Sequence, residues 1–156
     1  MTVEIGMQAP DFTLEANNGE SITLSALKGK NVVLYFYPKD MTPGCTTEAC
    51  DFRDQYQQFN DVNAVILGIS PDPVARHEKF IEQYGLPFLL LADEDHSVAE
   101  AYDVWKLKKN FGKEYMGIER STFILDKDGK IVKEWRKVQV KGHVEEALQY
   151  IKENLA

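Results

Sequence analysis

The sequence has little of what nucleic-acid-binding and membrane proteins need. Its 25 Asp and Glu residues outnumber its 18 Lys and Arg residues, which gives a formal net charge of −7. Sequence-independent nucleic-acid binding depends on a basic surface, so this balance argues against it. The longest apolar run, residues 86–92, contains a proline and is far shorter than the ~20 residues of a membrane-spanning helix. We therefore expect neither a nucleic acid nor a membrane as a partner.

Signals of export, repetition and nucleotide binding are also absent. The N-terminal residues have neither the basic stretch nor the apolar stretch of a signal peptide, which predicts a cytoplasmic protein. No repeat, low-complexity tract or linker is visible, so we expect residues 1–156 to form a single domain. No glycine-rich loop follows an expected strand, and a nucleotide site therefore has no support.

Cysteine and histidine are scarce. There are 2 cysteines, Cys45 and Cys50, and 3 histidines. We interpret His77 and His143 as exposed helical residues and His96 as a surface residue after an acidic turn. A zinc site usually needs a second ligand pair, which this sequence lacks, so we expect no metal. In a reducing compartment a cysteine pair is more often catalytic than structural, and we favour Cys50 as a redox partner of Cys45.

The remaining pattern is typical of an α/β protein. Continuous β-branched and aromatic runs indicate strands buried on both faces, at residues 31–37, 64–70, 88–92 and 122–125. Turn residues at 17–19 and 126–129 predict an N-terminal β-hairpin and a second hairpin that ends in residues 131–135. With helices between the strands, this order predicts a central mixed β-sheet flanked by helices.

Helix signals lie between the expected strands. Thr42-Pro43 and Asp72-Pro73 each combine an N-cap residue with a first-turn proline. An apolar stripe follows the first signal and predicts one helix through its five members, Cys45, Ala49, Phe52, Tyr56 and Phe59. Further helices are expected at residues 97–102 and 143–155. We interpret the basic run of Lys106, Lys108 and Lys109 as a solvated loop.

The segment from Tyr37 to Cys50 carries the chemistry. A strand ends at Tyr37, at the sheet edge where α/β proteins usually bind ligands. With Thr42 as N-cap, Cys45 takes the third helical position, close to unpaired backbone N–H groups and the positive end of the helix dipole. Both favour the thiolate, which is the nucleophilic form of cysteine.

Each residue of this segment also has a structural interpretation. Cys45 can be a small buried apolar residue, although Gly44 beside it leaves room for a ligand at the first turn. Thr42 can serve only as an N-cap, or its hydroxyl can also donate to a bound oxygen or to the thiolate. Pro38, taken alone, is most simply a strand terminator.

The residues Pro38 to Cys45, Pro-Lys-Asp-Met-Thr-Pro-Gly-Cys, resemble the P-x-x-x-T-x-x-C signature of the peroxiredoxins. Adding Cys50 makes the segment similar to the bacterioferritin-comigratory-protein, or Q-type, subfamily. Residues 6–14, 68–70 and 117–123 also resemble the family, so the likeness covers nearly the whole chain. It implies a thioredoxin-like fold and an active site that includes Pro38, Thr42, Cys45 and Arg120.

The resemblance implies a thiol-dependent peroxidase of antioxidant defence that reduces hydrogen peroxide and organic hydroperoxides. Cys45 would become a sulfenic acid, and Cys50 would then form an intramolecular disulfide with it. A thioredoxin-type dithiol protein would reduce this disulfide. The scheme needs no cofactor, neither metal nor haem nor flavin, and we expect a monomer or weak homodimer.

The resemblance changes how we interpret Arg120, and it offers a second role for Glu48. An arginine that opens a strand is usually a solvated surface residue, but in a peroxiredoxin Arg120 would stabilise the thiolate and the charge developing on peroxide oxygen. Glu48 can orient that guanidinium. We favour the simpler interpretation, a first-turn carboxylate stabilised by the helix dipole.

Helix geometry sets a condition on the disulfide. Residues five apart in an α-helix have Cα atoms about 8.6 Å apart, from the rise and radius of the helix. A disulfide requires roughly 6.8 Å or less. We therefore predict an uninterrupted helix from Pro43 through Cys50 in the reduced protein, and an unwound or reshaped turn in the oxidised protein.

Two other functions remain as alternatives. A thiol–disulfide oxidoreductase would be expected to show Cys-x-x-Cys, and a copper-binding module Cys-x-x-x-Cys with a distant histidine; four residues separate Cys45 from Cys50 here. Stoichiometric peroxide consumption by the reduced protein would separate the first alternative, and a copper titration the second.

Overall fold

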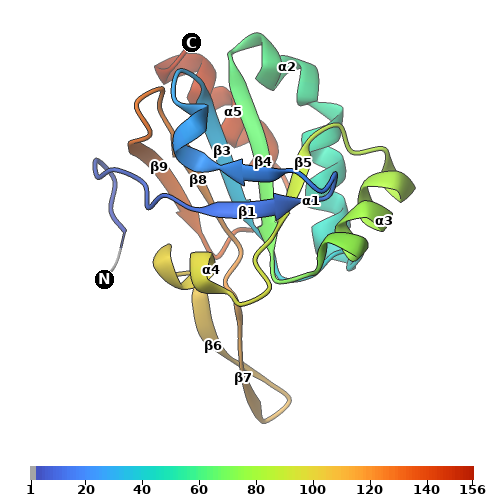
Figure 1. The fold of residues 1–156 in the computed structure, drawn as a ribbon. Helices are drawn as coiled ribbons and strands as arrows, with labels where there is room; N and C mark the ends of the chain where they lie inside the picture. The colour runs from blue at the N-terminus through green and yellow to red at the C-terminus, as the bar shows by residue number, and fades with distance from the viewer. Residues whose placement is uncertain (1–2) are drawn as a thin grey trace.

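The computed structural model describes residues 3–156, which fold around one seven-stranded sheet (Figure 1). The strand order is β2-β1-β5-β4-β3-β8-β9. The strands are β1 (Thr13–Ala16), β2 (Ser21–Thr23), β3 (Asn31–Phe36), β4 (Ala64–Ser70), β5 (Leu89–Ala92), β8 (Ser121–Leu125) and β9 (Ile131–Arg136). The pairs β3–β4 and β4–β5 are parallel and the other pairs antiparallel, which confirms the predicted mixed sheet and N-terminal hairpin.

The central strands are buried on both faces, as their apolar runs predicted. All six residues of β3 are buried, and alternate side chains enter two separate apolar clusters. Val33 and Tyr35 pack in a cluster with Phe52, whereas Leu34 and Phe36 pack on the opposite face. Because side chains alternate along a strand, helices or loops must cover both faces of this sheet.

The helices are α1 (Pro43–Asp54), α2 (Tyr56–Asp61), α3 (Val74–Tyr84), α4 (Ser97–Ala101) and α5 (His143–Asn154), with a 3₁₀ turn η1 (Leu24–Leu27). The prediction of one helix through Phe59 was wrong, because the chain turns at Gln55 between α1 and α2. The turn still directs Phe59 inward, where its ring lies 5.7 Å from that of Phe52. The apolar stripe was therefore real, although the helix that carries it is divided.

A second difference concerns the basic run, which was predicted as a loop. Its three lysines lie on β6 (Trp105–Asn110), which pairs with β7 (Lys113–Ile118) in a separate hairpin. The hairpin projects from the body of the molecule, and Phe111 at its turn is almost fully exposed (Figure 1). Because most of it has no buried face, it lacks the apolar pattern by which strands are recognised. No helix among residues 3–156 is long and apolar enough to cross a membrane.

Candidate active site

The candidate nucleophile lies in the first turn of α1, directly after the loop that joins β3 to α1. α1 begins at Pro43, directly after Thr42 in the N-cap position, and this confirms Cys45 as the third helical residue. The Cys45 side chain is 2% exposed and packs in the same apolar cluster as Tyr35 and Ala49. Its sulfur is therefore shielded from bulk water and lies close to the unpaired N–H groups of the helix start.

A guanidinium from a distant part of the chain reaches this sulfur. Arg120 directly precedes β8, and because Ser121 of β8 pairs with Phe36, Arg120 lies beside the end of β3. Its Nη2 donates a hydrogen bond to the Cys45 Sγ at 3.3 Å. Its Nη1 donates to the Glu48 Oε1 at 2.7 Å. Sheet pairing thus brings together residues 75 positions apart in sequence.

The charges of this cluster are set by burial and by each other. Burial raises the pKa of Glu48 to about 7, although the neighbouring Arg120 acts in the opposite direction. Burial alone would lower the pKa of Arg120, but the Glu48 carboxylate and the Cys45 sulfur raise it above its ordinary value. The guanidinium therefore stays charged at any working pH, and it places a fixed positive charge beside the Cys45 sulfur.

Gly44 has a specific steric role. A Cβ at this position would lie 3.2 Å from Nη2 of Arg120. That separation is tighter than ordinary van der Waals contact, so a side chain here would press on the guanidinium. The space expected for a ligand is occupied by Arg120 itself.

Thr42 occupies the N-cap position, but its side chain does not cap the helix. Its hydroxyl donates to the Lys39 carbonyl oxygen at 2.8 Å, within the loop that joins β3 to α1. The hydroxyl proton is therefore used inside the loop, and the lone pairs of the oxygen are left as acceptors. Pro38 lies in the same loop, half-buried, directly after Tyr37.

Cys50 lies on α1 in different surroundings. Both cysteines are free, and α1 runs without interruption through both, as predicted for the reduced form. Cys50 is only half-buried. Burial raises the pKa of its thiol, Arg53 acts against this, and the carboxylates of Asp54 and Asp51 raise it further. The Cys50 sulfur is thus held as the neutral thiol.

A cavity of about 790 Å³ opens beside Arg120, between the β6–β7 hairpin and the body. Its lining includes Leu107 and Lys108 of β6 and Val138. The wall is part apolar and part charged, with more basic than acidic side chains, and it includes the guanidinium that contacts Cys45.

Three sequence-based interpretations were wrong. Glu48 contacts Arg120 directly and is fully buried, so it is more than a carboxylate that favours the helix dipole. Its position three residues after Cys45 placed it on the same helix face, which was the available signal. His77 and His143 are both buried rather than exposed; His77 pairs with Asp40, and His143 with Thr122. Within residues 3–156 no group of His, Cys, Asp and Glu side chains could hold a metal ion.

Comparison with known proteins gives one consistent result. Residues 5–134 match the model of the AhpC/TSA family. The chain is 65% identical over 153 residues to the peroxiredoxin Bcp of Bacillus subtilis (strain 168), covering 98% of each protein, and 40% identical over 152 residues to that of Escherichia coli (strain K12), covering 97% of each.

Solved structures show the same likeness. Peroxiredoxin Q of Xanthomonas campestris superposes with a TM-score of 0.91 at 42% identity, covering 97% of this chain and 99% of that one. A structure of the bacterioferritin comigratory protein of Xanthomonas campestris, described in terms of its alkyl peroxide reduction activity, gives 0.90 at 42% identity and covers 96% and 98% of the two chains.

Proposed function

The chain belongs to the AhpC/TSA family, as a peroxiredoxin of the Bcp/PrxQ subfamily, and from this premise we propose how its thiol peroxidase activity is divided among its residues. Cys45 is the nucleophile, Cys50 the resolving thiol, and Arg120 with Thr42 the peroxide-binding groups. Pro38 closes the strand and shapes the loop that presents Thr42. The observation that carries this assignment is the 3.3 Å contact between Arg120 Nη2 and Cys45 Sγ.

In the first step the Cys45 thiolate attacks the terminal oxygen of ROOH. The S–O bond forms as the O–O bond breaks, giving a sulfenic acid and RO⁻, which takes up a proton to become ROH. Arg120 faces the sulfur and stabilises the negative charge as it moves from sulfur to oxygen. The Thr42 lone pairs accept from the peroxide O–H, because its own proton is engaged by Lys39.

In the second step the Cys50 sulfur condenses with the sulfenic acid, forming the disulfide and releasing water. The intact helix keeps the two Cα atoms about 8.6 Å apart, so α1 must unwind locally before the bond can form. The first turn of a helix opens at low cost in free energy. Unwinding also removes Cys45 from Arg120, so the enzyme alternates between a peroxide-binding and a disulfide form.

The site and the relatives support the class of peroxide that we propose as substrate. The cavity beside Arg120 has room for an alkyl group as well as for hydrogen peroxide, which supports organic hydroperoxides as substrates. The activity described for the Xanthomonas campestris relative supports the same class. A thioredoxin-type dithiol protein reduces the disulfide by exchange in the third step, in the cytoplasm, with residues 1–156 acting as one domain.

A coupled assay tests this proposal. Peroxide, the protein, thioredoxin, thioredoxin reductase and NADPH are mixed, and NADPH oxidation is followed at 340 nm with hydrogen peroxide or tert-butyl hydroperoxide. We expect turnover with both peroxides. Replacing the thioredoxin system by glutathione and glutathione reductase is the control. Turnover with glutathione alone would contradict the dithiol reductant, and no turnover with any dithiol would contradict the cycle.

A further inference from the structure

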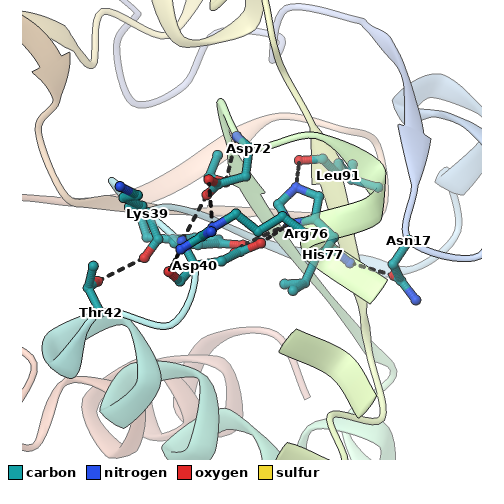
Figure 2. Close-up of polar contacts among 11 residues, drawn as sticks. Asn17, Lys39, Asp40, Thr42, Asp72, Arg76, His77 and Leu91 are labelled. Carbon is teal, nitrogen blue, oxygen red and sulfur yellow. Dashed lines mark hydrogen bonds and ion pairs between the residues drawn. The ribbon is translucent and has the colours of Figure 1, made fainter. Parts of the chain in front are cut away.

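A buried polar cluster lies behind the loop that joins β3 to α1 (Figure 2). It is centred on Asp40, which is fully buried and lies two residues before Thr42. His77 of α3 is also fully buried and contacts the Asp40 side chain, while Arg76 and Asp72 contact the Asp40 backbone (Figure 2). The peroxidase scheme uses none of these groups.

Every polar group of Asp40, in the backbone and in the side chain, forms a hydrogen bond. Its backbone N–H donates to Asp72 Oδ2 at 2.8 Å, and its carbonyl oxygen accepts from Arg76 Nη2 at 3.2 Å. One carboxylate oxygen accepts from the Tyr37 hydroxyl, and the other lies 2.6 Å from His77 Nδ1. The middle of the loop is thus tied to the end of β3, to the segment after β4, and to α3.

The contact between Asp40 and His77 requires a proton. Nε2 of His77 lies 3.0 Å from the Leu91 carbonyl oxygen, which can only accept, so Nε2 carries a hydrogen. A neutral imidazole would then present the lone pair of Nδ1 to the carboxylate. A contact of 2.6 Å needs a hydrogen between Nδ1 and Oδ2, so the pair holds one shared proton and is neutral as a whole.

Both ring nitrogens of His77 are engaged within the protein, and neither it nor Asp40 is exposed. The pair therefore has no free group to offer a substrate. What it can do is hold the loop in place. The residue after Asp40 supports this, because Met41 has a φ of 64°, in the left-handed region that a non-glycine side chain adopts at a cost. Such a conformation persists only when neighbouring contacts enforce it.

We propose that Asp40 and His77 are positioning residues of the peroxidase reaction. The hydrogen bond between them anchors the loop to α3, so that Thr42 and the first turn of α1 keep the geometry in which peroxide meets Cys45 and Arg120. This proposal rests on the proposed function of Cys45. According to this proposal the reaction rate depends on α3 as well, although α3 contributes no catalytic group.

Two substitutions at one position separate this role from a general contribution to stability. In His77→Asn the side-chain amide nitrogen lies near the place of Nδ1 and can donate to Asp40. In His77→Gln it lies near the place of Nε2 and keeps the bond to Leu91 instead. Asn leaves the larger cavity and should destabilise the fold more. The proposal nevertheless requires the larger loss of peroxidase rate in His77→Gln.

Asp40→Asn provides a conservative rescue. Its amide oxygen accepts from Tyr37, and its amide nitrogen donates to a neutral His77 that keeps its own bond to Leu91. Every hydrogen bond of the side chain is kept without the carboxylate charge. If His77→Gln does not fold, Tyr37→Phe is a milder substitution that serves the same purpose, because it removes only the hydroxyl that donates to Asp40. His143→Gln is the matched control, a buried histidine that bonds Thr122 instead.

All variants are made in the Cys50→Ser background, so that Cys45 is the only thiol. Two rates are measured for each: the second-order reaction with hydrogen peroxide, and alkylation by iodoacetamide, which needs a thiolate but no peroxide-binding geometry. Urea unfolding records stability in parallel. We expect the ratio of the two rates to fall about 10- to 100-fold in His77→Gln, because misplacing reacting groups by about 1 Å has costs of that order.

In His77→Asn and Asp40→Asn the ratio should stay much closer to that of the parent, and in His143→Gln it should equal the parent's. A ratio that follows the loss of stability, with Asn worse than Gln at position 77, would overturn the proposal. So would a ratio that is the same in all variants. If the parent itself does not react with peroxide, it is the proposed function that fails, and the two failures are therefore distinguishable.

Discussion

Helix α1 carries two cysteines in contrasting environments. Cys45 is buried in the first turn, with the guanidinium of Arg120 at 3.3 Å from its sulfur. Cys50 is five residues further on and half-buried, and burial together with Asp54 and Asp51 raises the pKa of its thiol. The comparison shows two thiols of one helix in different surroundings, one beside a guanidinium and one beside carboxylates. The roles that we propose for them, nucleophile and resolving thiol, rest on this difference.

The largest expected effect comes from removing one thiol at a time. Cys45→Ser should abolish peroxide consumption, because an alcohol provides almost no anion at neutral pH. Cys50→Ser should complete one turnover and then accumulate sulfenic or over-oxidised acid. Single-turnover stopped-flow measurements with hydrogen peroxide distinguish the two. If Cys50→Ser were inert and Cys45→Ser reacted, the roles would have to be exchanged.

Arg120→Lys is the next largest change. Lysine keeps the charge but not the planar fork that contacts Cys45 and Glu48 together. We expect the oxidation rate to fall about 10- to 100-fold, since one aligned donor is lost, with little change in urea stability. Lys108→Arg, at the wall of the cavity, is a control for altering a nearby cation. An unchanged rate in Arg120→Lys would mean that the fork of Arg120 does not act in the oxidation step and serves only to pair with the buried Glu48.

Glu48→Gln changes the dependence of stability on pH. The folded pKa of Glu48 is about 7, above the ordinary 4.5, so the folded state binds this proton more tightly than the unfolded state. The stability gained from this proton is complete below the ordinary pKa and is lost as pH rises through about 7. Glutamine does not ionise, so the Glu48→Gln protein does not lose this stability as the pH rises. The free energy of unfolding of Glu48→Gln, relative to that of the wild type, should therefore increase by a few kcal/mol between pH 5 and 8.

Urea unfolding at several pH values measures this difference. Glu153→Gln, at an exposed position of α5, is the matched control and should give a curve parallel to the wild type. Parallel curves for Glu48→Gln as well would mean that the buried carboxylate does not titrate in this range.

Gly44→Ala should give a smaller effect. The new Cβ would lie 3.2 Å from Nη2 of Arg120 and displace the guanidinium by a few tenths of an ångström. We expect the oxidation rate to fall about three- to tenfold. Stability should hold or rise, because alanine favours a helix more than glycine does. Stopped-flow rates and urea curves on the same samples check both, and a slower but also less stable variant would point to helix damage instead.

The smallest expected effect is the local unwinding of α1, which is measured by amide hydrogen exchange. We expect amide hydrogen exchange across residues 44–51 to be faster in the disulfide form than in the dithiol form, because the bond requires the turn to unwind. Protection in α5 (His143–Asn154), remote in sequence, serves as the internal reference. Equal protection of residues 44–51 in both forms would contradict the unwinding.

How far the sequence predicts this molecule depends on where each structural signal lies. Strands β3, β4 and β8 were predicted within one residue, because both of their faces are buried and their apolar runs are continuous. The β6–β7 hairpin was missed because it projects from the body, and Leu107 and Met116 are exposed on it.

In the candidate site, too, features set by adjacent residues were predictable and contacts between distant residues were not. The position of Cys45 in its helix was predictable from adjacent residues, since Thr42 and Pro43 set the helix start. The contact with Arg120 was not, because it joins residues 75 apart through the sheet, and only the family resemblance pointed to it. The buried His77 has its partner in Asp40, 37 residues away in sequence, and no local pattern indicates this contact.

The mass of the peroxide-treated wild-type protein, combined with a count of free thiols, tests the central claim most directly. One equivalent of hydrogen peroxide added to the reduced protein should remove both thiols and lower the mass by two hydrogens, with a peptide map that links Cys45 to Cys50. A gain of one oxygen with one thiol remaining would contradict the division of labour between the two cysteines.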